Sequence, residues 1–400
     1  MSQGVAITGM GIISAIGNNV AENYHALINQ QKGISRVSKI ETHHKHDIMV
    51  GEIAATNKQL EIQLGLETTH NYSRTALLGA IAAKQAVVDA QITNVSEYRT
   101  GLVSATSVGG MDMTEKYYYE YLENKALQKY IESHHAGDST QKIAQQLGIE
   151  QSLVTTISTA CSSGANAIMF GARLIKTGRL DRVVVGGTDC LSKFTINGFK
   201  TLMILSDSYN APFDENRSGL NLGEAAAYLV LESDSIVNKE NKKPLAYLTG
   251  YGNANDAYHQ TASSEQGDGA TLAMQKALSV ARLNPSDINY INAHGTATAN
   301  NDLSEGRAII RVFGENPPAF SSTKPYTGHT LAAAGAIEAV YSILALQNNI
   351  LFPNLNFVTQ MKEFALTPQY NLKQKELTHV LSNSFGFGGN CSSLIFSKQG

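Results

Sequence analysis

The amino-acid sequence predicts an α/β fold built from two similar halves. Short apolar runs alternate with longer segments of helical period, which is the pattern of strands and covering helices in a layered sheet. A charged stretch at 239–244 breaks this pattern and is the best candidate linker. On either side of it, a strand ends in a Thr-Gly-x-Gly turn, at 8–11 and at 249–252. We therefore expect a duplicated architecture with halves 1–243 and 244–400.

The elements of the first half follow from period and length. Short apolar runs predict buried strands at 5–11, 101–106, 181–187 and 225–232. Apolar residues on one helical face predict a helix over 73–90; they are Leu77, Leu78, Ile81 and Val88.

Each half also contains a strand that leads into a helix of small residues. In the first half the strand 154–161 continues into 162–167, and in the second half the strand 319–324 precedes a helix that begins at Thr330. The stretch from about 111 to 146 has no counterpart in the second half, and we interpret it as an inserted helical cap. It is rich in tyrosine: Tyr117, Tyr118, Tyr119 and Tyr121.

Composition narrows the class of protein. Of 400 residues, 42% are apolar and only 16% are charged, which excludes disorder as a bulk property. Lys and Arg number 31 against 34 Asp and Glu, so no global basic field exists to hold nucleic acid or an anionic membrane. Three scattered cysteines form neither a disulfide framework nor a zinc-type pair. With no apolar run long enough to span a bilayer and no secretory signal pattern, we expect a cytoplasmic protein.

Cys161 lies where a strand meets the helix that starts with Ser162, Ser163 and Gly164. Unpaired N–H groups and the positive end of the dipole favour thiolate at such a position, which suits a nucleophile. A buried small residue is about an equally good interpretation of this cysteine.

Two of the eleven histidines stand apart from the others. His294 follows the strand 288–291, and His329 precedes the helix 330–349; both lie in turns rich in Gly and Thr. Two imidazoles beside one thiol could polarise a carbonyl or carboxylate while the thiol carries an acyl group. The remaining histidines in polar loops, such as His43 and His134, are interpreted as solvated.

Glycine-rich turns provide two further candidates. The segment 385–389, Phe-Gly-Phe-Gly-Gly, is either a hairpin turn or an oxyanion-binding or gating loop. Gly9-x-Gly11-x-x-Ser14 is only a partial dinucleotide fingerprint, and no acidic residue after a following strand supports it.

Taken together, four segments resemble the elongating β-ketoacyl-acyl carrier protein synthases of the thiolase superfamily. They occur in the family's order and cover nearly the whole chain: 159–164 (TACSSG), 292–298 (NAHGTAT), 321–329 (SSTKPYTGH) and 383–389 (NSFGFGG). The resemblance implies a duplicated five-layer α-β-α-β-α architecture. Two histidines, in place of His and Asn, separate the elongating from the initiating members.

The resemblance also implies catalytic roles. Cys161 would accept the acyl chain, and His294 and His329 would hold the malonyl thioester and assist its decarboxylation. The backbone N–H groups of Cys161 and Phe387 would form the oxyanion hole, with Phe387 as gatekeeper. Lys324, paired with Glu305, would position the site.

Further residues are expected to contact the substrate or an ion. Thr296 and Thr298 would bind the pantetheine arm, Val108 would line the acyl tunnel, and Phe385 and Gly388 would contact substrate beside the gate. A structural cation site seen in some relatives maps onto Asn292, Glu338, Ser382 and Asn383. No organic cofactor is implied. The expected partners are an acyl carrier protein bearing phosphopantetheine and a second ketosynthase-like subunit, as homodimer or heterodimer.

Two departures bear on the pathway. Cys391 stands where the family usually has Asn, with Asn390 one position earlier, and Ala211 stands where fatty-acid relatives often carry an arginine for the carrier protein. We therefore lean towards a specialised polyketide or polyene ketosynthase over a housekeeping fatty-acid synthase. The alternatives are a chain-length-determining partner subunit without catalysis, which typically loses the nucleophile, and acyl transfer to CoA.

Overall fold

The structure, a computed structural model, describes residues 4–149 and 152–399. Ten strands form one sheet in the order β11-β10-β14-β15-β9-β1-β8-β6-β4-β5. Within each half, the strands run outward from the centre in the same order of sequence: first, fifth, fourth, second, third. In both halves the inner three strands pair antiparallel and the outer three parallel. The predicted duplication is therefore confirmed by the topology.

The strands are short and mostly buried on both faces. The first half contains β1 (Val5–Ile13), β4 (Thr100–Ala105), β5 (Val154–Ile157), β6 (Arg182–Asp189) and β8 (Ala225–Glu232). The second half contains β9 (Ala246–Asn255), β10 (Tyr290–Asn292), β11 (Ala319–Ser321), β14 (His379–Phe385) and β15 (Asn390–Ser397). Two small sheets are formed by β2 (Ile34–Arg36), β3 (Met49–Gly51) and β7 (Leu222–Gly223), and by β12 (Ile350–Leu351) and β13 (Lys373–Gln374). The strands predicted at 5–11, 101–106, 181–187 and 225–232 are present, displaced by at most two residues at either end. The strands predicted at 154–161 and 319–324 are present but end earlier, at Ile157 and Ser321.

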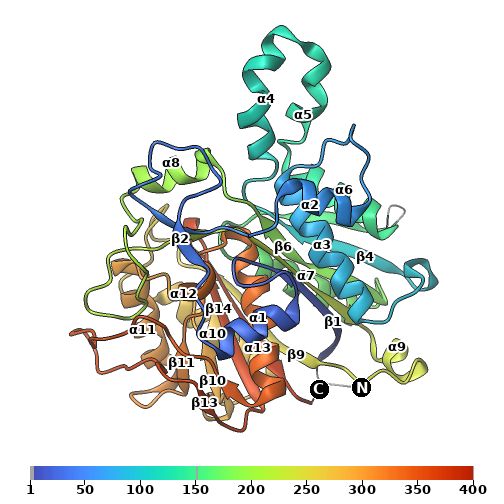
Figure 1. The fold of residues 1–400 in the computed structure, drawn as a ribbon. Coiled ribbons are helices and arrows are strands. Elements are labelled where there is room, and N and C mark those ends of the chain that lie inside the picture. The colour runs from blue at the N-terminus through green and yellow to red at the C-terminus, as the bar shows by residue number, and fades with distance from the viewer. Residues whose placement is uncertain (1–3, 150–151, 400) are drawn as a thin grey trace.

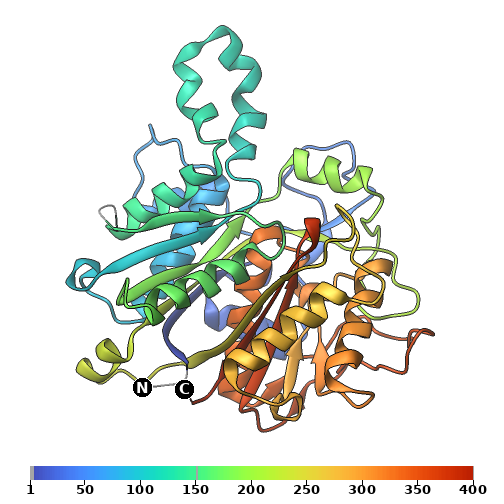
Figure 2. The same ribbon diagram turned by 180° about the vertical axis from the view of Figure 1, so that it is seen from behind.

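Helices complete five layers (Figures 1 and 2). In the middle, α7 (Ser163–Lys176) and α13 (Ala334–Asn348) pack against each other and against strands of both halves. The outer face of the first half is covered by α3 (Arg74–Asp89) and α6 (Ala136–Leu147), and that of the second by α10 (Asp268–Ala281) and α11 (Ala299–Phe313). Pairing between β1 and β9 joins the two β layers edge to edge.

The central helices fit this position because of their composition. A Cβ added at Gly171 of α7 would lie 2.3 Å from the Val185 side chain, so only glycine allows this approach to the sheet. The segment Leu331–Asn348 is long and apolar enough to cross a membrane, but 89% of it is buried within the protein. It is therefore a core helix of the fold.

Five other helices connect these layers: α1 (Val20–Ile28), α2 (Asn57–Leu64), α8 (Lys193–Thr201), α9 (Asp234–Lys239) and α12 (Lys324–Thr327). The charged linker predicted at 239–244 begins at the end of α9 and continues up to the residues before β9.

The predicted cap is helical, but only part of it stands apart from the body. The helices α4 (Met111–Glu123) and α5 (Gln128–Glu132) project as a hairpin (Figures 1 and 2), whereas α6 packs on α3 and β5. The rings of Tyr117 and Tyr130 stack at 4.3 Å and hold the hairpin together, and Tyr119 is 80% exposed.

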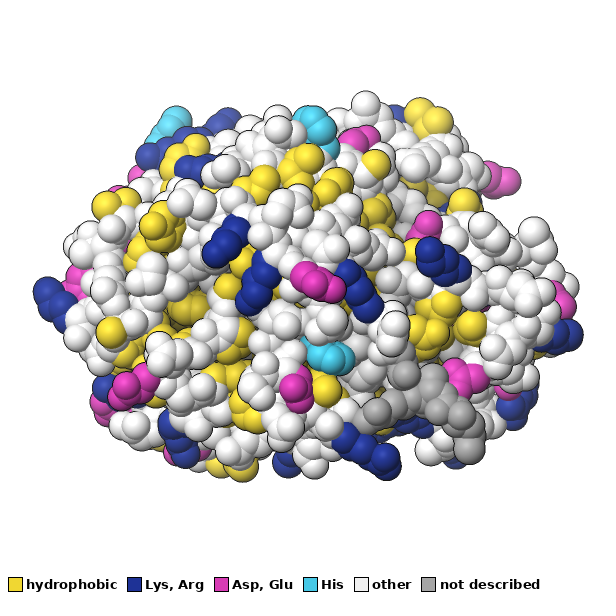
Figure 3. Space-filling view, turned by 90° about the horizontal axis from the view of Figure 1, so that it is seen from below, with side chains coloured by type: hydrophobic (Ala, Val, Ile, Leu, Met, Phe, Trp, Pro, Cys, Tyr) yellow, Lys and Arg dark blue, Asp and Glu magenta, His cyan; other side chains and the backbone are white. Residues whose placement is uncertain are grey.

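Charged side chains of both signs are interspersed on the face shown in Figure 3. No continuous field of one sign covers that face, which agrees with the near balance of basic and acidic residues in the composition. Attraction of a highly charged partner there would require a local cluster of like charges.

Candidate active site

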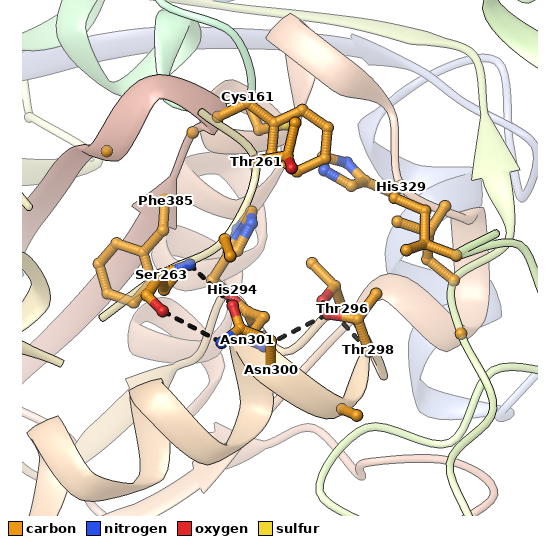
Figure 4. Close-up of a pocket in the computed structure, with 18 of the residues that line it drawn as sticks. Cys161, Thr261, Ser263, His294, Thr296, Thr298, Asn300, Asn301, His329 and Phe385 are labelled. Atoms are coloured by element: carbon orange, nitrogen blue, oxygen red, sulfur yellow. Dashed lines mark hydrogen bonds between the residues drawn. The ribbon is translucent and has the colours of Figure 1, made fainter. Parts of the chain in front are cut away.

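Cys161, His294 and His329 line one cavity of about 380 Å³ (Figure 4). They come from three loops: Cys161 lies between β5 and α7, His294 follows β10, and His329 follows α12. The two imidazole rings are 5.4 Å apart and nearly perpendicular. The structure thus brings together the three residues on which the sequence interpretation depends.

A tight turn presents Cys161. Ala160, just before it, has a positive φ of 51°, and the hydroxyl of Ser163 accepts a hydrogen bond from the Thr159 N–H at 2.8 Å. A positive φ is strained for alanine, and such strain is typical of functional turns. The side chain lies within the fold, since Cys161 is only 5% exposed.

The protonation of Cys161 differs from the sequence expectation. Burial raises the pKa of its thiol to about 11, because the thiolate loses its hydration. The charge of Lys324 and the N–H groups of Phe387 and of Cys161 itself lower the pKa, but by less. The expectation that the helix N-terminus would favour thiolate was therefore wrong for the resting site, where desolvation is the larger effect.

His294 has one defined tautomer. The Lys324 ammonium lies 3.2 Å from His294 Nδ1 and can only donate, so Nδ1 accepts and Nε2 carries the proton. Burial, then the charge of Lys324 and then that of His329, hold the pKa of His294 well below its usual value. The ring is neutral at physiological pH.

His329 reaches the same state by another contact. Its Nδ1 accepts a hydrogen bond from the backbone N–H of Leu331 at 3.3 Å, which leaves the proton on Nε2. Burial, and secondarily the charge of Lys324, depress the pKa of His329 well below its usual value. Both imidazoles are therefore neutral and each has an Nε2–H to donate.

The predicted pairing of Lys324 with Glu305 was wrong. Lys324 forms its ion pair with Glu338 of α13, and it also donates to the backbone carbonyl of His294. Glu305 instead accepts the backbone N–H groups of His294 at 2.9 Å and of Gly295 at 2.8 Å. Burial raises the pKa of both carboxyl groups to about 7. Glu305 lies in the second turn of α11, and its carboxylate oxygens are taken up by the N–H groups of the loop that precedes the helix.

Phe387 is placed beside the nucleophile. Its ring stacks on Phe199 of α8 with centroids 5.8 Å apart. Its backbone N–H points to the sulfur of Cys161 and lowers the pKa of that thiol by hydrogen bonding. Gly388 is exposed, with a φ of 80° that suits glycine, and its N–H donates to the carbonyl of Gln260. Phe385 is buried and its ring tilts against His294 at 5.6 Å.

The outer part of the cavity is polar. The hydroxyls of Thr296 and Thr298 lie 2.9 Å apart and both line it. Sequence reasoning missed Asn300, whose side-chain amide pairs with the backbone N–H and C=O of Ser263 at 2.7 and 3.0 Å (Figure 4). Arg217 was missed as well; it lines the cavity and donates only to backbone carbonyls. The polar first turn after Thr298 was the available signal for Asn300.

Val108 is not among the residues that line this cavity. It is half-buried against an apolar cluster that also contains Phe199, Leu331 and Ile204, and of these Ile204 lines the cavity. Because Phe199 also stacks on Phe387, this cluster lies next to the Phe387 ring. The tyrosines of the cap do not line the cavity of this chain either.

The proposed cation site fits in part. Asn292 and Ser382 are paired residues of β10 and β14, and the side-chain oxygens Oδ1 and Oγ are buried without hydrogen-bond partners. Buried oxygens of this kind are ligands for hard cations. The side chain of Asn383 is used elsewhere, donating to Glu305 and accepting from Ser393, and Glu338 is paired with Lys324. Among the described residues, no group of three or more His, Cys, Asp or Glu could hold a metal ion.

Two family models match most of the chain in succession. Residues 2–236 match the β-ketoacyl synthase N-terminal domain and residues 245–358 match the β-ketoacyl synthase C-terminal domain. The chain therefore belongs to the β-ketoacyl synthase family and is a condensing acyltransferase.

Individual relatives cover the full length. The chain is 33% identical to 3-oxoacyl-[acyl-carrier-protein] synthase 2 of Staphylococcus aureus (strain N315), over 98% of each chain. Its fold is similar to the ishigamide ketosynthase/chain length factor, with a TM-score of 0.93 and 28% identity over all of both chains. It is also similar to a ketosynthase solved with its type II polyketide acyl-carrier protein, with a TM-score of 0.88 and 26% identity over 99% and 100% of the two chains.

Proposed function

We propose that this protein lengthens a carrier-bound acyl chain by two carbons, using Cys161 as nucleophile and malonyl-acyl carrier protein as extender. The observation that carries the proposal is one cavity that holds Cys161 and two neutral imidazoles. In each imidazole Nδ1 accepts the contact from the protein, so Nε2–H is available to donate. Such a pair can bind an anionic oxygen but is not poised to deliver water to an acyl-enzyme.

The first step acylates Cys161. A bond forms between Sγ and the thioester carbonyl carbon, the carbon–sulfur bond to pantetheine breaks, and the thiol proton ends on the released pantetheine sulfur. The tetrahedral oxyanion is held by the N–H groups of Cys161 and Phe387, the two amides that already act on Sγ in the resting site. The high pKa of the thiol keeps it protonated until a thioester enters.

The second step uses the imidazoles. Malonyl thioester loses CO₂, and the electron pair of the broken carbon–carbon bond becomes an enolate whose oxygen accepts from Nε2–H of His294 and of His329. The enolate carbon then attacks the acyl carbon, and the Cys161 thiolate leaves and takes up a proton. Decarboxylation drives the sequence, so the chemistry requires no organic cofactor.

The remaining site residues have supporting roles in this proposal. Thr296 and Thr298 bind the pantetheine arm in the polar part of the cavity, beside Phe385 and Gly388. Rotation of Phe387 away from Phe199 gives the acyl chain access to the apolar cluster that contains Val108. Lys324 and Glu305 are positioning residues that fix His294 through its ring and its backbone.

The proposed cation site is based on two buried side-chain oxygens without hydrogen-bond partners. Asn292 Oδ1 and Ser382 Oγ would hold a cation that supplies structural charge compensation near Glu338, with the side chain of Asn383 left out of the set.

The partners proposed are an acyl carrier protein and a second ketosynthase-like subunit, in the cytoplasm. Two similar structures, a ketosynthase/chain length factor and a ketosynthase in complex with its type II polyketide acyl-carrier protein, support this proposal and our preference for a specialised pathway. The presence of Cys161, His294 and His329 argues against a non-catalytic partner subunit. Within the chain, we keep the boundary between halves at 243/244.

Intact-protein mass spectrometry tests the proposal. Wild-type protein incubated with acyl-carrier protein gains the acyl mass, and subsequent malonyl-carrier protein releases a product two carbons longer. Cys161→Ala gains no acyl mass, while Cys391→Ala, the matched control in the same cavity, still does. An acyl mass on Cys161→Ala, or its absence from the wild type with every carrier tried, would overturn the proposal.

A further inference from the structure

Asn390 lies where the glycine-rich segment 385–389, called the gate turn below, meets the last strand, β15. Its side-chain oxygen Oδ1 lies within hydrogen-bond distance of three donors: Ser162 Oγ at 2.8 Å, Asn166 Nδ2 at 2.8 Å and Asn253 Nδ2 at 2.9 Å. Ser162 is the N-cap residue of α7 and directly follows the nucleophile Cys161, while Asn253 belongs to β9. One side-chain oxygen therefore joins the gate turn, the nucleophile helix and a central strand.

The donors around Asn390 are themselves fixed by further hydrogen bonds. Asn166 Nδ2 also donates to Thr159 Oγ1 at 2.9 Å, and Asn166 Oδ1 accepts from Ser392 Oγ at 2.8 Å. The Ser162 hydroxyl is equally close to the carbonyl of Thr159, so its single proton is shared between two acceptors. A side chain with this many fixed contacts cannot move without disturbing the turn before α7.

The backbone of the gate turn is closed on the same residue. The N–H of Gly386 donates to the carbonyl of Asn390 at 2.8 Å, and the N–H of Gly389 donates to the carbonyl of Gly386 at 3.1 Å. A Cβ added at Gly386 would lie 2.6 Å from the carbonyl oxygen of Thr159, so the gate turn runs directly against the nucleophile turn. Gly388 and Gly389, with φ of 80° and 84°, are left as the points where the turn can bend.

The side chain of Cys391, the next residue, points to the opposite face of β15 from that of Asn390. Successive side chains of a strand point to opposite faces, and Cys391 lines the catalytic cavity while Asn390 faces α7. The one-residue displacement of Asn noted in the sequence therefore moves the carboxamide out of the cavity face and onto the nucleophile helix.

We propose that Asn390 is a positioning residue. It keeps the Phe387 N–H at a fixed distance from Cys161 while the Phe387 ring rotates to open and close the acyl pocket. The Cys161 and Phe387 amides must stay about 3 Å from the same oxyanion, and an error of about 1 Å there can cost on the order of 100-fold in rate. Asn390 anchors the C-terminal end of the turn through a contact to the nucleophile helix itself, so the two amides are held by one shared support. This inference rests on the proposed function of Cys161.

The test compares variants of the acceptor. Asn390→Leu removes Oδ1 at similar size, and Asn390→Asp keeps an acceptor for all three donors. We expect Asn390→Leu to slow acylation of Cys161 about 10- to 100-fold, measured by mass spectrometry as the rate constant at saturating acyl-carrier protein. The carrier concentration that gives half of this rate should change little. Asn390→Asp should stay within about threefold of the wild type, because a carboxylate accepts the same hydrogen bonds. Equal losses in both variants would overturn the proposal, as would an unchanged rate in Asn390→Leu.

Two controls keep the result readable. Asn253→Ala removes the one donor of the three that belongs to neither the nucleophile turn nor α7. It should lower the unfolding midpoint about as much as Asn390→Leu while losing far less activity. If activity follows the midpoint in all variants, Asn390 has a merely structural role and the proposal is wrong. Wild-type acylation in the same assay separates this outcome from failure of the proposed function itself, since that failure would leave the wild type without an acyl mass.

Discussion

The two halves of this molecule share one topology but differ in the chemistry they present. In the first half, the loop after the third strand, β5, carries Cys161; in the second half, the loop after the third strand, β11, leads to Lys324 and His329. The loop after the second strand carries His294 in the second half and only Thr106, Ser107 and Val108 in the first. Equivalent loops of the duplicated fold thus supply a nucleophile from one side and its imidazole partners from the other.

A buried carboxylate supports the second-strand loop in both halves. Asp189 accepts from the Thr106 hydroxyl and from the N–H and hydroxyl of Ser107, and it also accepts from the N–H of Ala332, just beyond His329. Glu305 accepts the N–H groups of His294 and Gly295. In the proposed mechanism the first half therefore contributes the nucleophile used in acylation, and the second contributes the two imidazoles used in decarboxylation together with the Phe387 N–H of the oxyanion hole.

The largest effect should come from removing an imidazole. His294→Ala and His329→Ala each delete one Nε2–H donor to the enolate, and we expect malonyl decarboxylation to fall about 100- to 1,000-fold. Self-acylation of Cys161 should be affected much less, because its oxyanion is held by backbone amides. Decarboxylation is followed as CO₂ release and acylation by mass spectrometry; normal decarboxylation in either variant would break the division between the halves.

The reactivity of Cys161 should rise steeply with pH. Below a pKa of about 11 the reactive thiolate fraction increases about tenfold per pH unit, so alkylation by iodoacetamide should rise roughly 100-fold from pH 7 to pH 9. Peptide mapping distinguishes Cys161 from Cys190 and Cys391, which are also buried. A plateau between pH 7 and 8 would show that the helix N-terminus outweighs burial after all.

Matched carboxylate variants sharpen the comparison directly. Glu305→Gln and Asp189→Asn each turn an amide NH₂ towards backbone N–H donors, which should cost about 1–3 kcal/mol of stability. We expect Glu305→Gln to reduce decarboxylation about tenfold with near-normal acylation, and Asp189→Asn to reduce acylation more than decarboxylation. Separate assays of the two half-reactions measure this, and an identical pattern in both variants would contradict independent roles for the two loops.

The smallest effect concerns the cation proposed beside β10 and β14. At a concentration tenfold above its Kd, a bound cation adds on the order of 1 kcal/mol, or a rise of about 2 °C in Tm. Thermal unfolding in potassium, sodium or N-methylglucamine chloride at equal ionic strength tests this, and Asn292→Leu should remove any difference. Equal Tm values in all three salts would leave Asn292 Oδ1 and Ser382 Oγ without an assigned ligand.

Much of the fold and the centre of the site could be predicted from the sequence. Strands β1, β4, β6 and β8 follow from local apolar runs, and the repeated Thr-Gly-x-Gly segments indicated the duplication. The prediction that these segments are turns was wrong, because both lie inside strands, β1 and β9, where their glycines allow close packing of α3 and α10. Cys161, His294 and His329 were found because each stands at the end of an element among small residues, a pattern that is local in the chain. The residues of the cavity mouth, such as Asn300, were missed because their partners lie in loops far along the sequence.

The sequence by itself thus determined which elements form, which residue types stand at their ends, and which family they resemble. Only the tertiary structure decided how those residues behave. It assigned Lys324 to Glu338 instead of Glu305, and it surrounded Cys161 with enough protein to raise the thiol pKa when the local helix favoured the opposite. Pairing and desolvation depend on atoms brought together from distant parts of the chain, and those distances exist only after folding.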